Sequence, residues 1–330
     1  MEVGRYIVYG AGGIGASLGA QLHEAGREVV LIARGAHHKA IAEKGLEYVT
    51  TERRRCLVLP VVEHPEAVGF RAGDVALLAM KTQDSLPAVE ALAAVAGPEL
   101  PVLCAQNGVE NERLVQRRFR SVIGLAVWIP ASFIDPGIVE NYAPRAPIEL
   151  GRVPRGGDAL TRAITRDLRE AGFAAEARED VLAWKYAKLL TNAVSSLDAV
   201  CGGRAGLDDV AVRIKQEGMT CYRQAGIATV PAAEYEARVA FAIAAMGEID
   251  GAPRKGGSST QSLARGQGSI ETDYINGEIV LLGRTFGAAT PVNEAIQQAA
   301  NELVSRRRAQ PFTPDELRAR IDVLARRPWP

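Results

Sequence analysis

The sequence predicts an α/β fold in which an N-terminal doubly wound, mostly parallel sheet is followed by a C-terminal all-helical domain. Short apolar runs of strand length alternate with helix-like segments as far as residue 178. This alternation is typical of a parallel sheet with helices on both faces. Beyond that point the periodic segments become long and helical. We therefore expect two domains, residues 1–178 and residues 179–330.

A series of strand-like runs follows along the first domain, each separated from the next by a turn or a helix-like segment. The runs are Ile7–Tyr9, Val29–Ile32, Cys56–Val62, Val75–Met80, Val102–Ala105, Val122–Trp128 and Pro147–Leu150. In a doubly wound sheet, ligands lie beyond the carboxyl ends of the strands. The residues that directly follow these runs are therefore the first candidates for a binding site.

The second domain consists of long stretches whose apolar residues recur with a helical period. These stretches are Asp180–Ala199, Asp208–Ala225, Ala232–Met246, Ile270–Gly283 and Val292–Arg307. Residues 251–262 are rich in glycine and serine and predict a loop between two of these helices.

The first strand runs into a glycine-rich turn with the spacing of a dinucleotide-binding loop. Gly10, Gly12 and Gly15 form the pattern GxGxxG before a helix-like stretch and a second apolar strand. Gly10 allows a tight turn, Gly12 lets the backbone approach a pyrophosphate, and Gly15 lets the helix pack on the strand. This pattern predicts a Rossmann domain, the alternative being a turn that only connects strand and helix. The expected cofactor-binding residues of the loop are Gly10, Ala11, Gly12, Gly13, Ile14 and Gly15.

Arg34 stands where dinucleotide sites distinguish between their two common cofactors. Sites for NAD place an Asp or Glu about 20 residues beyond the glycines, where it binds the ribose 2′-hydroxyl. This chain instead has Ala33 and Arg34 at the end of the second strand. The guanidinium indicates a 2′-phosphate and therefore NADPH/NADP, the alternative being an arginine that only faces solvent.

The composition excludes several classes of function. Lys plus Arg and Asp plus Glu number 39 each, so no net field favours nucleic acid or an anionic membrane. No apolar run approaches the length of a membrane span, and the first strand begins too early to leave room for a signal peptide. We therefore expect a cytoplasmic protein without nucleic-acid or membrane partners.

The cysteines and histidines indicate neither a metal site nor histidine catalysis. The four cysteines are scattered without CxxC spacing. The four histidines, His23, His37, His38 and His64, all lie within the first 64 residues, away from the second domain. We expect no bound metal and a proton donor of another residue type.

Two polar residues follow strands of the predicted sheet. Lys81 directly follows the run Val75–Met80, and Asn107 follows Val102–Ala105 in an Asn-Gly turn. Either residue is well placed to contact a cofactor or substrate. The alternatives are a surface lysine and an Asn-Gly pair chosen for its turn conformation alone.

The helix-like segment 181–197 carries an unusual polar stripe. Lys185, Lys188, Asn192, Ser195 and Ser196 share one side of its helical wheel. Asn and Ser are poor helix formers, but they supply short hydrogen-bonding groups, which is typical of a face that lines a cleft. Partial burial would lower the pKa of a lysine here and make it a general acid, the alternative being an ordinary surface lysine.

Glu271 is the carboxylate that we expect to complete this site. It shares a helix face with Ile275, Ile279 and Leu282, which indicates partial burial. A buried carboxylate needs a partner such as Lys188 or a hydroxyl of a ligand. The alternative is a first-turn glutamate that stabilises the helix N-terminus.

In this order the motifs resemble the 2-dehydropantoate 2-reductase, or ketopantoate reductase, family over nearly the whole chain. The distance from Ser259 to Glu271 and the phrase Glu-Thr-Asp-Tyr-Ile-Asn-Gly at 271–277 are its most specific parts. The resemblance implies reduction of a 2-oxo acid by NADPH on the route to pantothenate, with Lys188 and Glu271 catalytic. It also implies a small-molecule partner and allows a homodimer. The residues that it assigns to the substrate are Asn107, Asn192, Ser196 and Ser259, and those that it adds to the cofactor site are Arg34, Lys81, Asn107 and Glu271.

The chain departs from the family pattern on the substrate side. Ser196, Gly206 and Gly256 stand where well-known members carry asparagine. These changes leave the exact oxo acid open, and Arg254 or Lys255 is an alternative ligand for the substrate carboxylate. A paralogue that reduces a different oxo acid and a silent NADPH-binding regulator remain the competing interpretations.

Overall fold

The computed structural model describes residues 2–133, 135–254, 256 and 270–327. The chain forms two compact units, Met1–Trp184 with Pro231–Arg254, and Lys185–Val230 with Lys255–Pro330. The sequence pattern places a single boundary after residue 178, whereas the chain passes from one unit to the other more than once.

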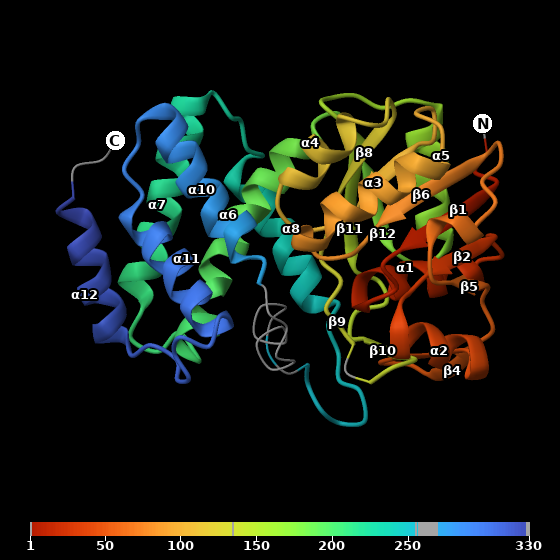
Figure 1. Cartoon of the computed structure of the whole chain (residues 1–330), viewed down its shortest axis with the longest axis horizontal. Helices are drawn as coiled ribbons and strands as arrows, with labels where there is room; N and C mark the ends of the chain where they lie inside the picture. The colour runs from red at the N-terminus through yellow and green to blue at the C-terminus, as the bar shows by residue number, and fades with distance from the viewer. Residues whose placement is uncertain (1, 134, 255, 257–269, 328–330) are drawn as a thin grey trace. The chain divides into compact units, whose positions relative to one another are not determined.

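The N-terminal unit alternates strands and helices, as Figure 1 shows for its red to yellow segments. Its strands are β1 (Arg5–Tyr9), β2 (Val29–Ile32), β3 (Leu46–Thr50), β4 (Arg54–Leu57), β5 (Val61–Val62), β6 (Asp74–Leu78), β7 (Val102–Cys104), β8 (Val122–Val127), β9 (Ala131–Ser132), β10 (Ile138–Asn141), β11 (Pro147–Arg152) and β12 (Ala174–Ala177). Its helices are α1 (Gly13–Glu24), α2 (Gly35–Lys44), η1 (Pro65–Ala67), η2 (Thr82–Asp84), α3 (Ser85–Val95), α4 (Glu110–Gln116), α5 (Ala159–Glu170) and α8 (Ala232–Ala244). The long helix α6 (Val181–Cys201) begins in this unit and continues into the other.

Among the described residues, eight strands form the larger sheet in the order β12-β11-β8-β7-β6-β1-β2-β5. β1 pairs in parallel with β2 and with β6, and β7 and β8 continue the parallel arrangement. β11 is antiparallel to β8. The strand order reverses at β1, because the chain goes from β1 to β2 and later returns to β6 on the other side. This arrangement confirms the predicted doubly wound, mostly parallel sheet.

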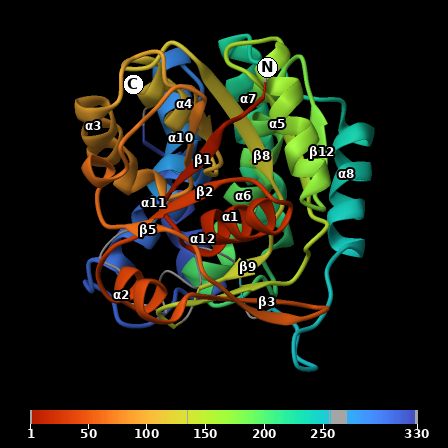
Figure 2. The ribbon, with the colours of Figure 1, turned by 90° about the vertical axis from the view of Figure 1, so that its right-hand side faces the viewer.

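Helices cover both faces of the larger sheet, because its central strands are apolar on both sides. Tyr6, Val8 and Leu31 on one face pack with the buried face of α1 and with α5. Ala76 and Leu78 on the other face pack with Val89 of α3 and Val115 of α4. α1 also contacts β10 of the smaller sheet, so it lies between the two sheets (Figure 2).

The smaller sheet corrects one predicted strand. Its order is β4-β3-β10-β9, and β4 pairs antiparallel with β3. The predicted continuous strand Cys56–Val62 is wrong, because it joins the end of β4 in the smaller sheet to β5, which is parallel to β2 in the larger one. Pro60 separates the two strands, as expected of a residue without the N–H that a sheet ladder needs.

α8 belongs to the N-terminal unit because it neutralises a buried carboxylate there. The side chain of Glu149 on β11 is fully buried and pairs with Arg178 and with Arg238 of α8. Burial raises the pKa of Glu149, and the two guanidinium groups act in the opposite direction. The ring of Tyr235 of α8 also lies near that of Trp128, with 6.1 Å between ring centroids.

The described part of the C-terminal unit is helical, which confirms the predicted class. It contains the remainder of α6 together with α7 (Asp208–Ala225), α10 (Thr272–Phe286), α11 (Pro291–Val304) and α12 (Pro314–Ala325). α10 packs on α7 and α11, and α11 packs on α12. Gly218 allows α7 to approach α6, since a Cβ there would lie 2.3 Å from Leu190. Within the ranges described, no helix combines the length and apolar character that a membrane crossing requires.

Candidate active site

Four predicted cofactor-binding positions follow the carboxyl ends of adjacent parallel strands. Gly10 follows β1, Arg34 follows β2, Lys81 follows β6 and Asn107 follows β7. These strands are neighbours in the order β7-β6-β1-β2, so the four positions share one edge of the sheet. The edge includes the point where the strand order reverses, which is where doubly wound sheets bind their ligands.

The three glycines of the loop differ in what surrounds them. A Cβ on Gly10 would lie 2.6 Å from the Met80 nitrogen, and one on Gly15 would lie 2.1 Å from the Gly10 oxygen. Gly10 also has a φ of 96°, where a side chain is strained. Beside Gly12, in contrast, the space is open to at least 4 Å. Gly10 and Gly15 therefore serve the close packing of the loop, whereas Gly12 leaves room for a ligand.

The other loop residues fix the start of α1. Gly12 is the N-cap of α1 and makes no side-chain capping bond, so the first N–H groups of the helix have no partner within it. Gly13 approaches Ala131, which a Cβ would meet at 3.2 Å. Ile14 packs against the core, and the carbonyl of Ala11 lies 2.6 Å from Nε2 of His37. The helix start thus offers backbone donors to an anion.

Arg34 is exposed at the end of β2 and is the N-cap of α2. Burial raises the pKa of Tyr9 at the end of β1, and the charge of Arg34 partly opposes this rise. The guanidinium therefore lies near the carboxyl ends of both strands. This position fits the predicted contact with a 2′-phosphate.

Asn111 joins the two loops that carry Lys81 and Asn107. Its side chain is fully buried and donates to Oγ1 of Thr82 at 3.1 Å and to the carbonyl of Asn107 at 3.3 Å. It also accepts from Oγ of Ser85 at 2.6 Å. The sequence analysis missed Asn111, although an amide one helical turn beyond Asn107 was a signal that could have found it.

In the C-terminal unit, Lys188 has an electrostatic environment suited to an acid. Burial lowers the pKa of Lys188 to about 7, and the charge of Lys185 contributes in the same direction. Glu271 acts in the opposite direction, so its carboxylate lies close enough to interact with the ammonium group. The structure thus brings together Lys188 and Glu271, which the sequence predicts to be partners.

Glu271 is 8% exposed and precedes α10 as its N-cap. Its side chain makes no capping hydrogen bond to the helix. The alternative role, a glutamate whose charge stabilises the helix N-terminus, needs no such bond and stays open.

The polar stripe of α6 is turned away from solvent for much of its length. Lys185 is 3% exposed and Ser196 is 2% exposed, whereas Lys188 and Asn192 are half-buried. Oγ of Ser196 donates to the Asn192 carbonyl at 3.4 Å. Ser259 and Lys255 lie outside the described residues. Gly206 and Gly256 have φ values of 73° and 66°, a left-handed conformation that favours glycine over most other residues.

The last two residues of the sequence motif at 271–277 have a structural role. The amide of Asn276 is fully buried and donates to the Ala193 carbonyl of α6 at 3.2 Å and to Asn293 of α11 at 3.0 Å. A Cβ on Gly277 would lie 2.8 Å from Gln297 of α11. These two residues therefore hold α10 against its neighbours and keep Glu271 beside Lys188.

Arg254 is a half-buried cation of the N-terminal unit. It donates to the carbonyl of Ala131 at 3.2 Å, and burial lowers its pKa, while Tyr142 acts in the opposite direction. In the part of the chain that the structure describes, no carboxylate forms an ion pair with it. Partial desolvation of a guanidinium without an anionic partner is unfavourable, so this position fits an anionic ligand.

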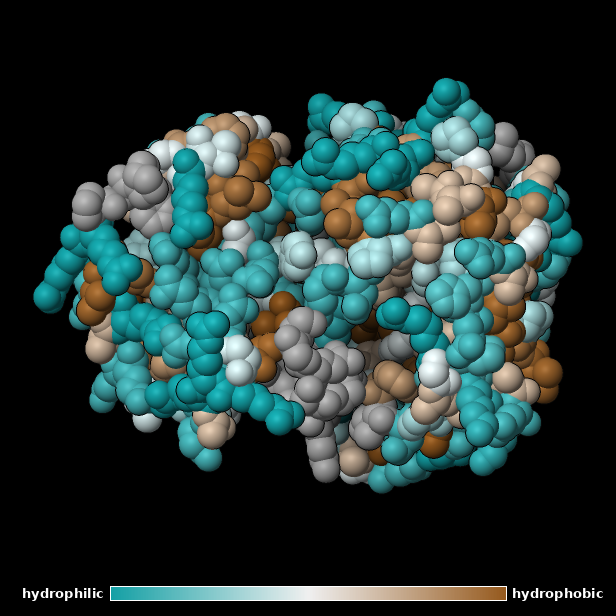
Figure 3. All heavy atoms as spheres, viewed as in Figure 1, coloured by the Kyte–Doolittle hydropathy of each residue, from teal (hydrophilic) through white to brown (hydrophobic). Residues whose placement is uncertain are grey.

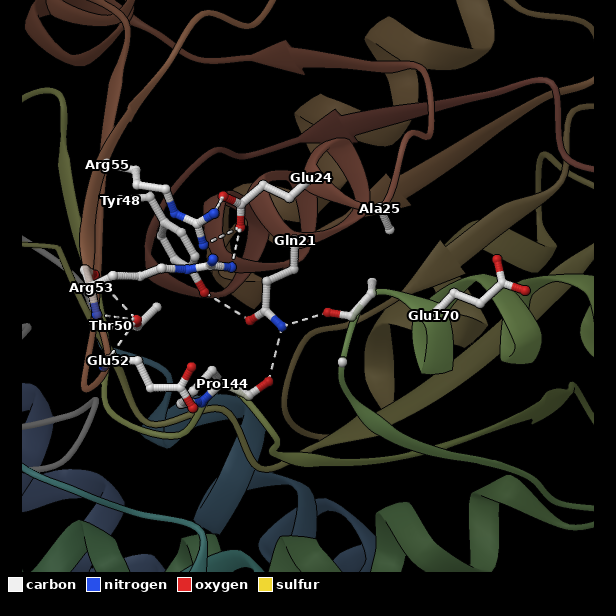
Figure 4. A pocket seen from close by; sticks show the side chains of 12 residues that line it. Gln21, Glu24, Ala25, Tyr48, Thr50, Glu52, Arg53, Arg55, Pro144 and Glu170 are labelled. Atoms are coloured by element: carbon white, nitrogen blue, oxygen red, sulfur yellow. Dashed lines mark hydrogen bonds and ion pairs between the residues drawn. The ribbon is translucent and has the colours of Figure 1, made fainter.

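A separate pocket of about 260 Å³ lies at the other end of α1, next to Gln21 and Glu24. Figure 4 shows Arg53 and Arg55 reaching toward Glu24, while Gln21 points toward Pro144. The cations of this pocket are thus neutralised by a carboxylate of the same unit, unlike Arg254. No motif in the sequence indicates this pocket.

Two family descriptions match the chain in sequence. Ketopantoate reductase PanE/ApbA matches residues 6–155, and Ketopantoate reductase PanE/ApbA C terminal matches residues 180–304. A 2-dehydropantoate 2-reductase of Archaeoglobus fulgidus is 29% identical over 305 residues, which are 90% of this chain and 96% of the relative.

Solved structures share the fold. A PanE/ApbA family ketopantoate reductase from Ralstonia eutropha JMP134 has a TM-score of 0.77 and 26% identity, covering 92% of this chain and 98% of that one. The ternary structure of D-mandelate dehydrogenase with NADH and anilino(oxo)acetate has a TM-score of 0.75 at 21% identity, covering 97% and 99% of the two chains. At this identity the second likeness shows the fold alone.

Proposed function

Because the chain belongs to the ketopantoate reductase family, as the sequence motifs predict, we propose that it reduces 2-dehydropantoate to pantoate with NADPH in pantothenate and coenzyme A biosynthesis. The observation that carries this proposal is Lys188, a half-buried lysine with a pKa of about 7 beside Glu271. A lysine in this state holds a proton near neutral pH and gives it up readily.

The N-terminal unit supplies the features that NADP requires. Gly12 leaves open space beside the start of α1, Gly15 allows the tight packing of the loop, and Arg34 offers a cation at the end of β2. We assign Lys81, Asn107 and Glu271 to the cofactor as well, on the family resemblance. When bound, the nicotinamide supplies the hydride.

The chain's own contribution is a proton and a set of orienting groups. Lys188 donates its proton to the oxygen of the substrate carbonyl and stabilises the negative charge that develops there. Glu271 keeps the ammonium form populated by opposing the effects of burial and of Lys185. Asn107, Asn192, Ser196 and Ser259 are the proposed substrate-binding side chains.

The residues on the substrate side are also compatible with a substrate other than 2-dehydropantoate, namely a related 2-oxo acid. Ser196, Gly206 and Gly256 replace asparagines of well-known members, so fewer amides are present to bind the substrate. We propose that Arg254, which has no carboxylate partner within the described ranges, binds the substrate carboxylate. A family paralogue that reduces a different 2-oxo acid is the second candidate, favoured by these three replacements. A homodimer and a cytoplasmic location stay predictions. On the face of the molecule drawn in Figure 3, hydrophobic side chains lie in small groups separated by hydrophilic ones.

NADPH oxidation with a panel of 2-oxo acids tests the reaction and the substrate together. We expect 2-dehydropantoate to have the highest kcat/KM, and Lys188→Met to lower kcat by about 100-fold or more while NADPH still binds. Lys215→Met, which changes an exposed lysine of α7, serves as the matched control. A Lys188→Met enzyme with wild-type kcat contradicts the proposed acid, and preference for another oxo acid favours the paralogue.

A further inference from the structure

His37 lies in the first turn of α2, three residues after Arg34, and is only 8% exposed. The reaction proposed above leaves it without a role. Its two ring nitrogens contact different parts of the N-terminal unit. Nε2 lies 2.6 Å from the Ala11 carbonyl of the glycine loop, and Nδ1 lies 2.9 Å from the backbone nitrogen of Gly137.

These two partners determine the tautomer of the imidazole. The Gly137 N–H can only donate, so Nδ1 must accept and carries no hydrogen. Nε2 therefore carries the hydrogen and donates it to the Ala11 carbonyl. Burial lowers the pKa of His37, which favours this neutral form. The ring of Phe133, with its centroid 4.4 Å from that of His37, fixes the plane of the imidazole.

The hydrogen bond from His37 to the Ala11 carbonyl fixes the orientation of the whole Ala11–Gly12 peptide group. The Ala11 carbonyl and the Gly12 N–H belong to the same peptide group, which is planar and trans, so they point in opposite directions. With the carbonyl held toward His37, the Gly12 N–H points away from α2. Gly12 is the N-cap of α1 and has open space beside it. His37 thus sets the direction of a backbone donor at the place where an anion is expected.

We infer that His37 is a positioning residue for the cofactor loop, holding the Ala11–Gly12 peptide so that the Gly12 N–H faces the pyrophosphate of NADPH. The inference rests on the proposed function, because it requires a dinucleotide at the loop. It also links the two halves of cofactor recognition, since α2, whose N-cap is Arg34, orients the glycine loop through its first turn.

A purely structural role makes a different prediction. If His37 only joins α2 to the turn before β10, its bond to Gly137 matters as much as its bond to Ala11. Asn and Gln separate these contacts, because the amide of Asn reaches the position of Nδ1 and the amide of Gln reaches that of Nε2. His37→Gln thus retains a donor for Ala11, whereas His37→Asn retains an acceptor for Gly137 only.

NADPH titration of the full-length protein tests the inference, with thermal unfolding measured alongside and His38→Gln as the control on the neighbouring, more exposed histidine. Loss of one well-placed hydrogen bond predicts about a tenfold weaker Kd for His37→Asn, with the KM for NADPH rising more than kcat falls. We expect His37→Gln to remain within about twofold of wild type. Equal Kd values for the two variants overturn the inference. Failure of the wild-type protein to bind NADPH contradicts the proposed function instead.

Nitrogen NMR of histidine-labelled wild-type protein tests the same inference without a substitution, should either variant fail to fold. We expect a neutral His37 with hydrogen on Nε2 and a signal that shifts when NADPH is added. The opposite tautomer, or a signal that NADPH leaves unchanged, overturns the positioning role.

Discussion

The carboxylate of Glu271 opposes both effects that lower the pKa of Lys188, namely burial and the neighbouring charge of Lys185. The value of about 7 is therefore a balance among three residues and their surroundings. A general acid is active while it is protonated, so kcat for reduction should be highest below this pKa and fall about tenfold for each pH unit above it.

Glu271→Gln removes the opposing charge, and we expect the descending limb of the kcat profile to move to lower pH. The measurement is kcat at saturating NADPH as a function of pH across the neutral pH range. Asp273→Asn, which removes an exposed carboxylate of the same helix, should leave the limb in place. A limb that does not move in Glu271→Gln shows that Lys188 is not the group that titrates.

Gly12 and Gly15 should respond to alanine in opposite ways. Gly12→Ala meets no neighbour within 4 Å and has a φ of −74°, so the fold should keep its stability to within about 1 kcal/mol. Its methyl group, however, occupies the space that we assign to the pyrophosphate, and NADPH affinity should fall at least about tenfold.

Gly15→Ala places a methyl group 2.1 Å from the Gly10 oxygen and should destabilise the unit by about 1–3 kcal/mol. Thermal unfolding and NADPH titration of both variants separate the two roles. Equal loss of stability in the two variants disproves the distinction.

Arg34→Ala should weaken NADPH binding by about tenfold to 100-fold, because a charged hydrogen bond to the 2′-phosphate is lost. NADH lacks this phosphate, and its affinity should change little. Arg53→Ala, at the opposite end of α1, is the matched control. Parallel losses for the two cofactors mean that Arg34 supports the fold of the loop rather than recognition of the phosphate.

Arg238→Met should destabilise the N-terminal unit by about 3 kcal/mol, because it removes one of two cations from the fully buried Glu149. Urea unfolding followed by tryptophan fluorescence is suitable, since Trp128 and Trp184 lie beside Tyr235 of α8. Arg120→Met removes an exposed partner of Glu99 and should cost less than about 1 kcal/mol. Similar losses in both variants contradict the assigned role of α8.

Features encoded within short segments were predictable from the sequence. The strand, the three glycines and the helix that follows them are adjacent in the chain, so their spacing alone specifies the loop. Lys188 and Glu271 are far apart in sequence, but the residues that share a predicted helix face with each of them indicate its partial burial. The predicted roles of the individual site residues stay predictions.

The features that the sequence left open depend on distant partners. Cys56–Val62 has the apolar character of one strand, yet its two ends pair with β3 and with β2 in different sheets. α8 has an ordinary helical period, and its place follows from the contact between Arg238 and Glu149, 89 residues apart. Asn276 belongs to the family signature in the sequence, and only its contacts with α6 and α11 reveal a structural role.

The late position of α8 in the chain has a consequence for synthesis. During translation the sheet residues emerge first, and Glu149 leaves the ribosome long before Arg238. Until residue 238 has been made, the nascent N-terminal unit contains the carboxylate of Glu149 with only one of its two cationic partners, Arg178, and without Arg238. The last steps in folding of the cofactor-binding unit therefore wait for a segment that follows part of the C-terminal unit, and a fragment ending near residue 178 should remain incomplete however long it is given to fold.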